Sequence, residues 1–142
     1  MFLLTLIATV WAANPFRVEV QPVELTVDSQ KDMVITFVVP RGFHLYHDMM
    51  SVEPLKQEGL AFASPVFPMG NLIADPANPA EMREVFDSTI QVTVPVQSAT
   101  VGTYLTEVKV RYQGCKDTLC YMPKSETLST VVEVKAATTS KP

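Results

Sequence analysis

The sequence has only two cysteines, and it lacks the Cys-x-x-Cys spacing of thioredoxin-like redox motifs. It also contains no Ser-His-Asp arrangement, no phosphate-binding loop and no dinucleotide fingerprint, so none of the chemistries that depend on those motifs is predicted. Neither sign of charge dominates the sequence, since the net charge is only −4 and no long block of like charge occurs. Nucleic-acid binding calls for a basic face, which this composition does not predict.

Helical periodicity is missing too, because no segment repeats apolar residues at positions i, i+3, i+4 and i+7 over three turns. Apolar and polar residues instead alternate in short runs. The clearest runs cover residues 16–20, 33–39, 90–96, 106–112 and 128–134. A period of two is typical of half-buried strands. We therefore predict one all-β domain, a sandwich of short strands joined by turns.

Residues 62–83 interrupt this pattern. Prolines recur there, at Pro65, Pro68, Pro76 and Pro79, and proline has no N–H group to donate to a neighbouring strand. The segment is therefore predicted to be a loop rather than a central strand. A loop of this length inside a compact domain usually has a function.

The two ends of the sequence differ from its body. Residues 1–12 are apolar and uncharged and end in Val10-Trp11-Ala12, which predicts a signal peptide cleaved before Ala13. The run is too short to span a bilayer, and the alternative is a buried first strand. Residues 13–135 would then form the domain and residues 136–142 a polar tail. Export would place the cysteines in an oxidising compartment.

The cysteines lie where one predicted strand gives way to the next. Cys115 follows the alternating run that ends at Tyr112, and the tetrapeptide 116–119 separates it from Cys120. A structural disulfide is one interpretation, although closing so short a loop contributes only about 2 kcal/mol in the chain-entropy model. A redox pair is the other, since cysteines close in sequence can meet as dithiol and as disulfide. The spacing alone leaves both open.

The residues around the cysteines carry a specific resemblance. Tyr112-Gln113-Gly114-Cys115, followed by Leu119-Cys120-Tyr121 and Pro123, resembles the active-site stretch of the N-terminal periplasmic domain of the DsbD thiol:disulfide interchange protein. Segments 40–46 and 67–86 are similar to other parts of that family, and residues 16–134 can be laid along it. The resemblance implies an immunoglobulin-like antiparallel β-sandwich and favours the redox interpretation.

The resemblance also implies a mechanism and partners. No cofactor is expected for this chain. Domains of the family pass electrons from a membrane electron donor of the DsbD transmembrane type to periplasmic thioredoxin-like proteins, namely a disulfide isomerase and a cytochrome c maturation thioredoxin. The second cysteine of the motif, Cys120 here, forms the mixed disulfide and Cys115 resolves it. Sequence position agrees, since Cys115 follows a half-buried strand whereas Cys120 follows the turn and should be more open to attack.

A set of residues is expected to surround the disulfide. Those predicted from the motif and the resemblance are Phe43, Tyr46, Tyr112, Gln113, Gly114, Leu119, Tyr121, Met82 and Glu84. The family places the tyrosine that matches Tyr46 beside the cysteines. It also places carboxylates of its cap loop near the thiols, where negative charge discourages thiolate formation. Met82 is the only large apolar residue of the matching segment 75–83.

Two other functions stay open. His44, His47, Met49 and Met50 offer ligands suited to copper in an exported protein, although residues 44 and 47 of a regular strand point to opposite faces. The other alternative is a structural interaction domain whose disulfide is inert. Since no hydrophobic helices follow the motif, we expect either a fragment of a longer membrane protein or a free-standing module fed by a separate one.

Overall fold

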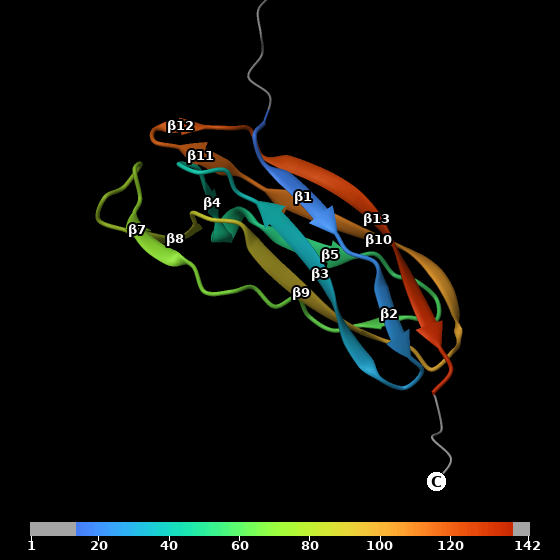
Figure 1. Cartoon of the computed structure of the whole chain (residues 1–142). Coiled ribbons are helices and arrows are strands. Elements are labelled where there is room, and N and C mark those ends of the chain that lie inside the picture. Colours follow the sequence, from blue (N-terminus) through green and yellow to red (C-terminus); the bar gives the residue numbers. More distant parts are fainter. Residues whose placement is uncertain (1–13, 138–142) are drawn as a thin grey trace, which may run out of the picture.

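A computed structural model describes residues 14–137 of the chain. Within that range the regular elements are strands, apart from one short 3-10 helix, η1 (His47–Met49). The strands form three sheets (Figure 1). The all-β prediction is confirmed. The signal peptide predicted for residues 1–12 lies outside the described residues.

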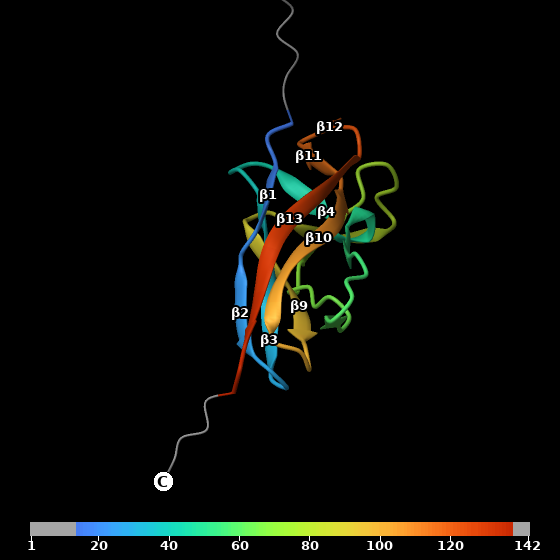
Figure 2. The same cartoon turned by 90° about the vertical axis from the view of Figure 1, so that its right-hand side faces the viewer.

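Two four-stranded sheets pack face to face (Figures 1 and 2). The first has the order β1-β3-β9-β6, with the bounds Arg17–Val20, Gln30–Val38, Ile90–Gln97 and Ala61–Phe62. The second has the order β2-β13-β10-β5, with the bounds Val23–Thr26, Lys124–Lys135, Gly102–Tyr112 and Ser51–Pro54. Neighbouring strands are antiparallel except β2 and β13, which run parallel. The sandwich is of the immunoglobulin-like kind that the family resemblance implies.

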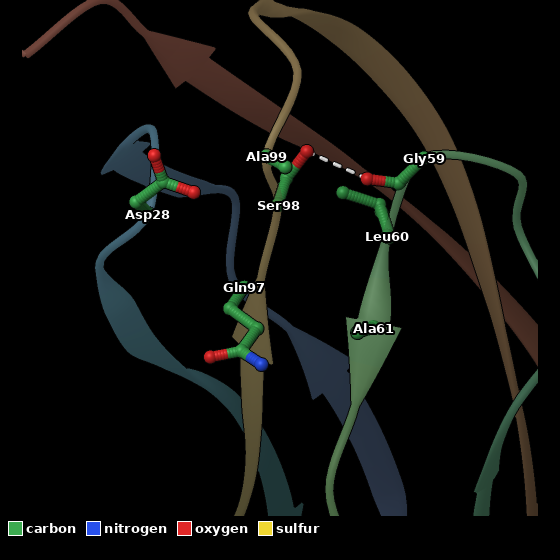
Figure 3. A pocket seen from close by; sticks show the side chains of 7 residues that line it. All are labelled: Asp28, Gly59, Leu60, Ala61, Gln97, Ser98 and Ala99. Atoms are coloured by element: carbon green, nitrogen blue, oxygen red, sulfur yellow. Dashed lines mark hydrogen bonds between the residues drawn. The ribbon is translucent and has the colours of Figure 1, made fainter.

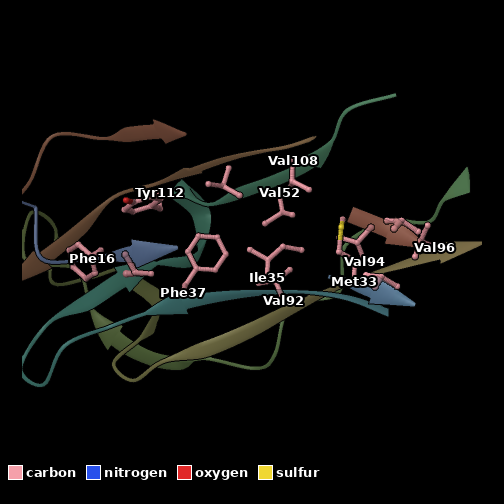
Figure 4. Close-up of a cluster of buried hydrophobic side chains, with 14 of the residues drawn as sticks. Phe16, Met33, Ile35, Phe37, Val52, Val92, Val94, Val96, Val108 and Tyr112 are labelled. Carbon is pink, nitrogen blue, oxygen red and sulfur yellow. The ribbon is translucent and has the colours of Figure 1, made fainter. Parts of the chain in front are cut away.

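The core lies between these two sheets and is filled by every second residue of the alternating runs (Figure 4). Its largest fully buried side chains include Met33, Ile35, Phe37, Val92, Val94, Val96, Val108, Val110, Tyr112 and Val132. The intervening residues of β10, such as Glu107 and Lys109, are exposed. One apolar face on each sheet is what drives the two sheets together, because its burial removes that surface from water.

A third sheet of five strands lies at one end of the sandwich, away from the end where β13 finishes (Figures 1 and 2). Its order is β12-β11-β4-β8-β7, with the bounds Leu119–Cys120, Gly114–Lys116, His44–Tyr46, Met82–Phe86 and Asn71–Ala74. These strands come from three separate parts of the chain. The sheet therefore brings the cysteine motif next to two segments that precede it in sequence by dozens of residues.

The prediction of a continuous loop over residues 62–83 is wrong in part. Strand β7 and the start of β8 lie within it and pair as an antiparallel hairpin. The prolines flank residues 71–74 and do not interrupt them, so the backbone there is free to form a strand. β7 is an edge strand, and residues 75–81 form the hairpin turn. That turn is closed by bonds from the Asp75 N–H to the Glu81 carbonyl and from the Glu81 N–H to the Asn78 carbonyl, both of 2.9 Å.

Candidate functional site

Cys115 and Cys120 lie directly opposite each other on the hairpin of β11 and β12. The register pairs Cys115 with Cys120 and Lys116 with Leu119, so only Asp117 and Thr118 form the turn. Asp117 adopts a left-handed φ of 52°, as tight two-residue hairpin turns require and as aspartate tolerates. The short spacer therefore brings the two side chains together. They form a disulfide, with 4.0 Å between the Cα atoms.

The two sulfur-bearing residues differ in exposure. Cys115 is fully buried and packs against Tyr46 and Val85. Cys120, at the end of the last short strand, is exposed. It borders an open cavity of about 370 Å³, whose lining residues are Tyr46, Asp75, Pro76, Ala77, Arg83, Gln113, Asp117, Thr118 and Cys120. The sequence prediction that Cys120 is the more accessible cysteine is confirmed.

Gly114 is required by close packing beneath the hairpin. A Cβ atom at this position would overlap the ring of Phe16 and lie 2.9 Å from the carbonyl oxygen of His44. Phe16 also meets the rings of Phe43 and Tyr121 edge to face, at centroid distances of 5.8 and 6.1 Å. Because Gly114 has no side chain, the aromatic cluster of Phe16, Phe43 and Tyr121 can pack directly against the hairpin.

The base of the hairpin is stabilised by Tyr112, Gln113 and Tyr121. The Gln113 side-chain amide donates to the Tyr121 carbonyl at 3.2 Å, and the Tyr121 N–H donates to the Gly114 carbonyl at 2.9 Å. Tyr112 is fully buried and its hydroxyl donates to the carboxylate of Glu126 at 2.8 Å. Burial, reinforced by this hydrogen bond, raises the pKa of Tyr112. Tyr112 therefore acts as a neutral structural side chain.

The ring of Tyr46 makes a cation–π contact that the sequence did not predict. The guanidinium of Arg83 lies over its ring, 3.7 Å from the centroid. The same guanidinium forms two bonds to the Asp48 carboxylate, of 2.6 and 3.2 Å. The hydrogen bond that Arg83 donates to Asp48 raises the pKa of Arg83. In sequence Arg83 resembles an ordinary solvated charge, and only the pairing of β4 with β8 brings it to the cavity beside Cys120.

Met82 and Glu84 alternate with Arg83 along β8 and do not line the cavity beside Cys120. Glu84 instead binds the Nδ1 atom of His47 and accepts a 2.8 Å bond from the Gly70 N–H. The hydrogen bond from His47, followed by that from Gly70, lowers the pKa of Glu84. Met82 is largely exposed. The structure therefore does not bring these two residues to the disulfide.

Phe43 and Leu119 flank the hairpin on two sides. Phe43 packs on the aromatic cluster below the cysteines, and the Lys116 ammonium lies 5.2 Å from its ring centroid. Leu119 is 62% exposed and precedes Cys120 directly. An exposed apolar residue beside the accessible sulfur suits contact with another protein.

The residues of the copper alternative do not form one group. His44 packs edge to face on Tyr46, whereas His47 contacts Phe67, Phe86 and the Glu84 carboxylate. Met49 packs near Cys115 and Met50 against the main core. Within residues 14–137, no cluster of three or more His, Cys, Asp or Glu side chains is arranged to hold a metal ion.

Another cavity, of about 430 Å³, lies at the opposite end of the sandwich (Figure 3). It is lined by Asp28, Gly59, Leu60, Ala61, Gln97, Ser98 and Ala99. The Ser98 hydroxyl is occupied by a 2.6 Å bond to the Gly59 carbonyl. Asp28 is the one ionisable residue of this lining, so the cavity carries no constellation for catalysis.

Comparison with known proteins shows the family to which the chain belongs. A family model described as the N-terminal part of the thiol:disulfide interchange protein DsbD matches residues 13–132. The chain belongs to this family. The DsbD proteins of Salmonella choleraesuis (strain SC-B67) and Salmonella typhi are 31% and 30% identical to it over 115 residues, which is 80% of this chain. The chain spans about a fifth (19%) of the length of these relatives.

Solved structures of the family share the fold. The N-terminal domain of Neisseria meningitidis DsbD in its reduced form matches with a TM-score of 0.56 and 18% identity, over 75% of this chain and 82% of that one. A complex between the DsbD and PilB N-terminal domains of the same organism matches with a TM-score of 0.58 and 19% identity, over 80% of each chain. In the described part of this chain, no helix has the length and apolarity needed to cross a membrane.

Proposed function

We propose that this DsbD-family domain performs thiol:disulfide exchange in the periplasm, using Cys115 and Cys120 as its redox pair. The observation that carries the proposal is the difference between the two sulfurs. Cys120 is exposed beside an open cavity, and Cys115 is buried directly across the hairpin from it. One sulfur is open to a partner while the other is held where it can complete the exchange.

The exchange runs in two displacement steps. In the reduced domain, the Cys120 thiolate attacks the disulfide of an oxidised partner, so that a mixed disulfide forms and one partner sulfur leaves as a thiolate. The Cys115 thiolate then attacks the Cys120 sulfur. The intramolecular disulfide forms, the mixed disulfide breaks, and the second partner sulfur leaves. The partner gains two electrons and the domain loses two.

Protein partners complete the cycle. The proposed acceptors are periplasmic thioredoxin-like proteins, a disulfide isomerase and a cytochrome c maturation thioredoxin, and the proposed donor is a membrane protein of the DsbD transmembrane type. A family member from Neisseria meningitidis was solved in complex with the PilB N-terminal domain, which supports recognition of a folded protein domain. Leu119 and the cavity lining beside Cys120 supply a contact surface for such a domain.

The surrounding residues have supporting roles in this proposal. Tyr112, Gln113, Gly114, Tyr121 and Phe43 keep the hairpin in place through packing and hydrogen bonds. Tyr46 forms the wall against which the buried sulfur lies. Met82 and Glu84 are proposed to act at most through the hairpin of β7 and β8, since neither lines the cavity.

The redox potential of the pair tests this function against the inert-disulfide alternative. The domain is equilibrated with glutathione buffers, and its oxidised fraction is read by thiol alkylation on gels. We expect a potential well above about −300 mV, below which structural disulfides usually lie. Rapid reduction of an oxidised thioredoxin-like protein by the reduced domain is the second expected result. A potential below that limit together with no transfer would assign the disulfide to structure alone.

A further inference from the structure

His44, Cys115 and Cys120 occupy neighbouring positions on three adjacent strands. Cys115 on β11 is the register partner of Cys120 on β12 and also of His44 on β4. Residues paired in this way project from the same face of a sheet, with Cβ atoms about 5 Å apart. The packing agrees, since Cys115 contacts Tyr46, and Tyr46 is in edge-to-face contact with His44 at a centroid distance of 5.2 Å. The side chains of His44 and Cys115 are therefore neighbours on this face of the sheet.

One nitrogen of this imidazole has no partner. The Nε2 atom of His44 is buried, and no hydrogen-bonding group of residues 14–137 reaches it. Leaving a buried polar atom without a partner costs free energy, so such atoms tend to have a functional explanation. The neighbouring sulfur is part of a disulfide and has no proton to donate. After reduction Cys115 becomes a thiol, which is a hydrogen-bond donor on the residue paired with His44.

We propose that His44 is the proton acceptor for the Cys115 thiol in the resolving step. The proposal rests on the exchange function proposed above and names the group that makes its second step possible. The S–H proton of Cys115 passes to Nε2 of His44, and the resulting thiolate attacks the Cys120 sulfur. The Cys115–Cys120 bond forms, the bond from Cys120 to the partner sulfur breaks, and the departing thiolate takes up the proton from the imidazolium.

The charges around His44 suit this role. Burial lowers the pKa of His44 below its ordinary value, and the nearby cation of Arg83 on β8 acts in the same direction. Asp87, just after β8, and Asp117, in the turn after β11, act in the opposite direction but do not outweigh burial. The imidazole is therefore neutral at pH 7 and able to accept a proton. It loses that ability only as the pH falls through its lowered pKa.

A buried thiol needs such help. Burial in apolar surroundings raises the pKa of a thiol, so little thiolate would exist at Cys115 near neutral pH without an acceptor. Cys120 is exposed to solvent, so its attack on a partner does not depend on His44. The proposal thus predicts that the second displacement, and not the first, depends on His44.

The test separates the two displacements. The reduced domain is mixed with an equimolar amount of dithiobis-nitrobenzoate, an aromatic disulfide whose thiolate product absorbs visible light. The first phase reports attack by Cys120 and the second reports resolution by Cys115. We expect His44→Gln to slow the second phase at pH 6.5 by roughly 10²-fold, the lower end for general-base catalysis, and to leave the first phase unchanged. The matched control is His47→Gln, whose imidazole binds Glu84 away from the disulfide; both of its phases should equal those of the wild type.

The pH profile gives a readout that a merely structural role would not change. The second-phase rate of His44→Gln should rise about tenfold per pH unit from pH 5.5 to 7.5, as for an unassisted thiol, while the wild-type rate levels off above the lowered pKa of His44. Equal second-phase rates and profiles in wild type and His44→Gln would overturn the proposal.

If His44→Gln does not fold, the wild type itself decides. Nitrogen chemical shifts of the His44 ring should then differ between the oxidised and reduced domain, and identical Nε2 shifts in both states would overturn the proposal. The two hypotheses fail separately. Normal second-phase kinetics with no transfer to any thioredoxin-like protein would reject the exchange function and keep the role of His44 in disulfide closure.

Discussion

The guanidinium of Arg83 lies 3.7 Å from the centre of the Tyr46 ring, and Tyr46 in turn packs against the buried sulfur residue Cys115. Arg83 also forms a two-bond ion pair with Asp48 in η1. These contacts attach β8 to η1, the segment that follows β4. Since β7 pairs only with β8 in this sheet, the position of the β7–β8 hairpin beside the disulfide depends on this attachment together with the pairing of β8 with β4.

Replacing Arg83 should loosen this hairpin. We expect Arg83→Ala to lower the free energy of unfolding by about 1 kcal/mol, because the cation–π contact and the ion pair are both partly exposed. Alkylation of Cys120 in the reduced domain should become faster. Arg83→Lys is the matched control, since it keeps the charge and loses the planar two-bond geometry. Its unfolding free energy and its alkylation rate should lie between those of the wild type and Arg83→Ala. Urea unfolding and timed alkylation measure both effects, and an unchanged alkylation rate in Arg83→Ala would argue against the attachment.

The turn of residues 75–81 is predicted to restrict the approach to Cys120 from one side. Asp75, Pro76 and Ala77 line the cavity that Cys120 borders. Deleting residues 77–80 should therefore open the cavity and speed the reaction of reduced Cys120 with a thiol reagent several-fold. As a control, inserting glycines into the loop after β9, at the other end of the sandwich, should leave that rate unchanged. Equal rates for the deletion variant and the wild type would mean that the turn does not restrict access.

Glu84 should contribute to the pH dependence of stability. Its pKa in the folded domain lies below the ordinary value of 4.5, chiefly because His47 binds the carboxylate. A lowered folded-state pKa stabilises the fold above the ordinary pKa, and this contribution is lost as the pH falls through the folded-state value. Glu84→Gln should therefore melt at a lower temperature than the wild type at pH 7, and the gap should narrow below pH 4.5. Glu107→Gln, on the exposed face of β10, should show no such pattern. Melting curves across this pH range decide it.

The fold should persist without the disulfide. The hairpin that the bond closes is short, so the bond is expected to contribute only about 2 kcal/mol. The main core lies between the two four-stranded sheets and does not include the cysteines. Thermal melts of oxidised and reduced domain should both be cooperative, with the reduced form melting a few degrees lower. Loss of the cooperative transition on reduction would return the disulfide to a structural role.

The parts of this structure that sequence reasoning predicted correctly are those with a local signal. The alternation of residues 106–112 predicted which side chains of β10 are buried, and the position of Cys120 after a turn predicted its exposure. Strand β7 was missed because prolines on both sides masked a four-residue strand with no alternation of its own.

The surroundings of the disulfide depend on contacts between distant segments. Phe16 fits beneath Gly114 although nearly a hundred residues separate them, and Arg83 reaches Tyr46 only through the pairing of β4 with β8. Nothing in the local sequence of either residue indicates such a contact. The resemblance of Glu84 to a family carboxylate was a weak guide to where its side chain lies. Residues one apart on a strand project from opposite faces, so a match in sequence does not by itself place a side chain beside the disulfide.

The last prediction concerns the division of labour between the two sulfurs. If Cys120 meets the partner and Cys115 resolves the intermediate, Cys115→Ser should accumulate a mixed disulfide with an oxidised thioredoxin-like protein and Cys120→Ser should not. The physical reason is access, since an attacking sulfur must approach along the line of the bond it breaks. Cys120 is exposed, whereas Cys115 is fully buried behind Tyr46 and Val85.

Each single variant is incubated with the oxidised partner and separated on non-reducing gels, and a double Cys→Ser variant serves as the blank. The adduct of Cys115→Ser should be stable, because the serine hydroxyl cannot displace the partner sulfur. An adduct formed only by Cys120→Ser would reverse the assignment. It would also show that the hairpin opens far enough to expose Cys115, since no partner sulfur can reach that residue while Tyr46 and Val85 cover it.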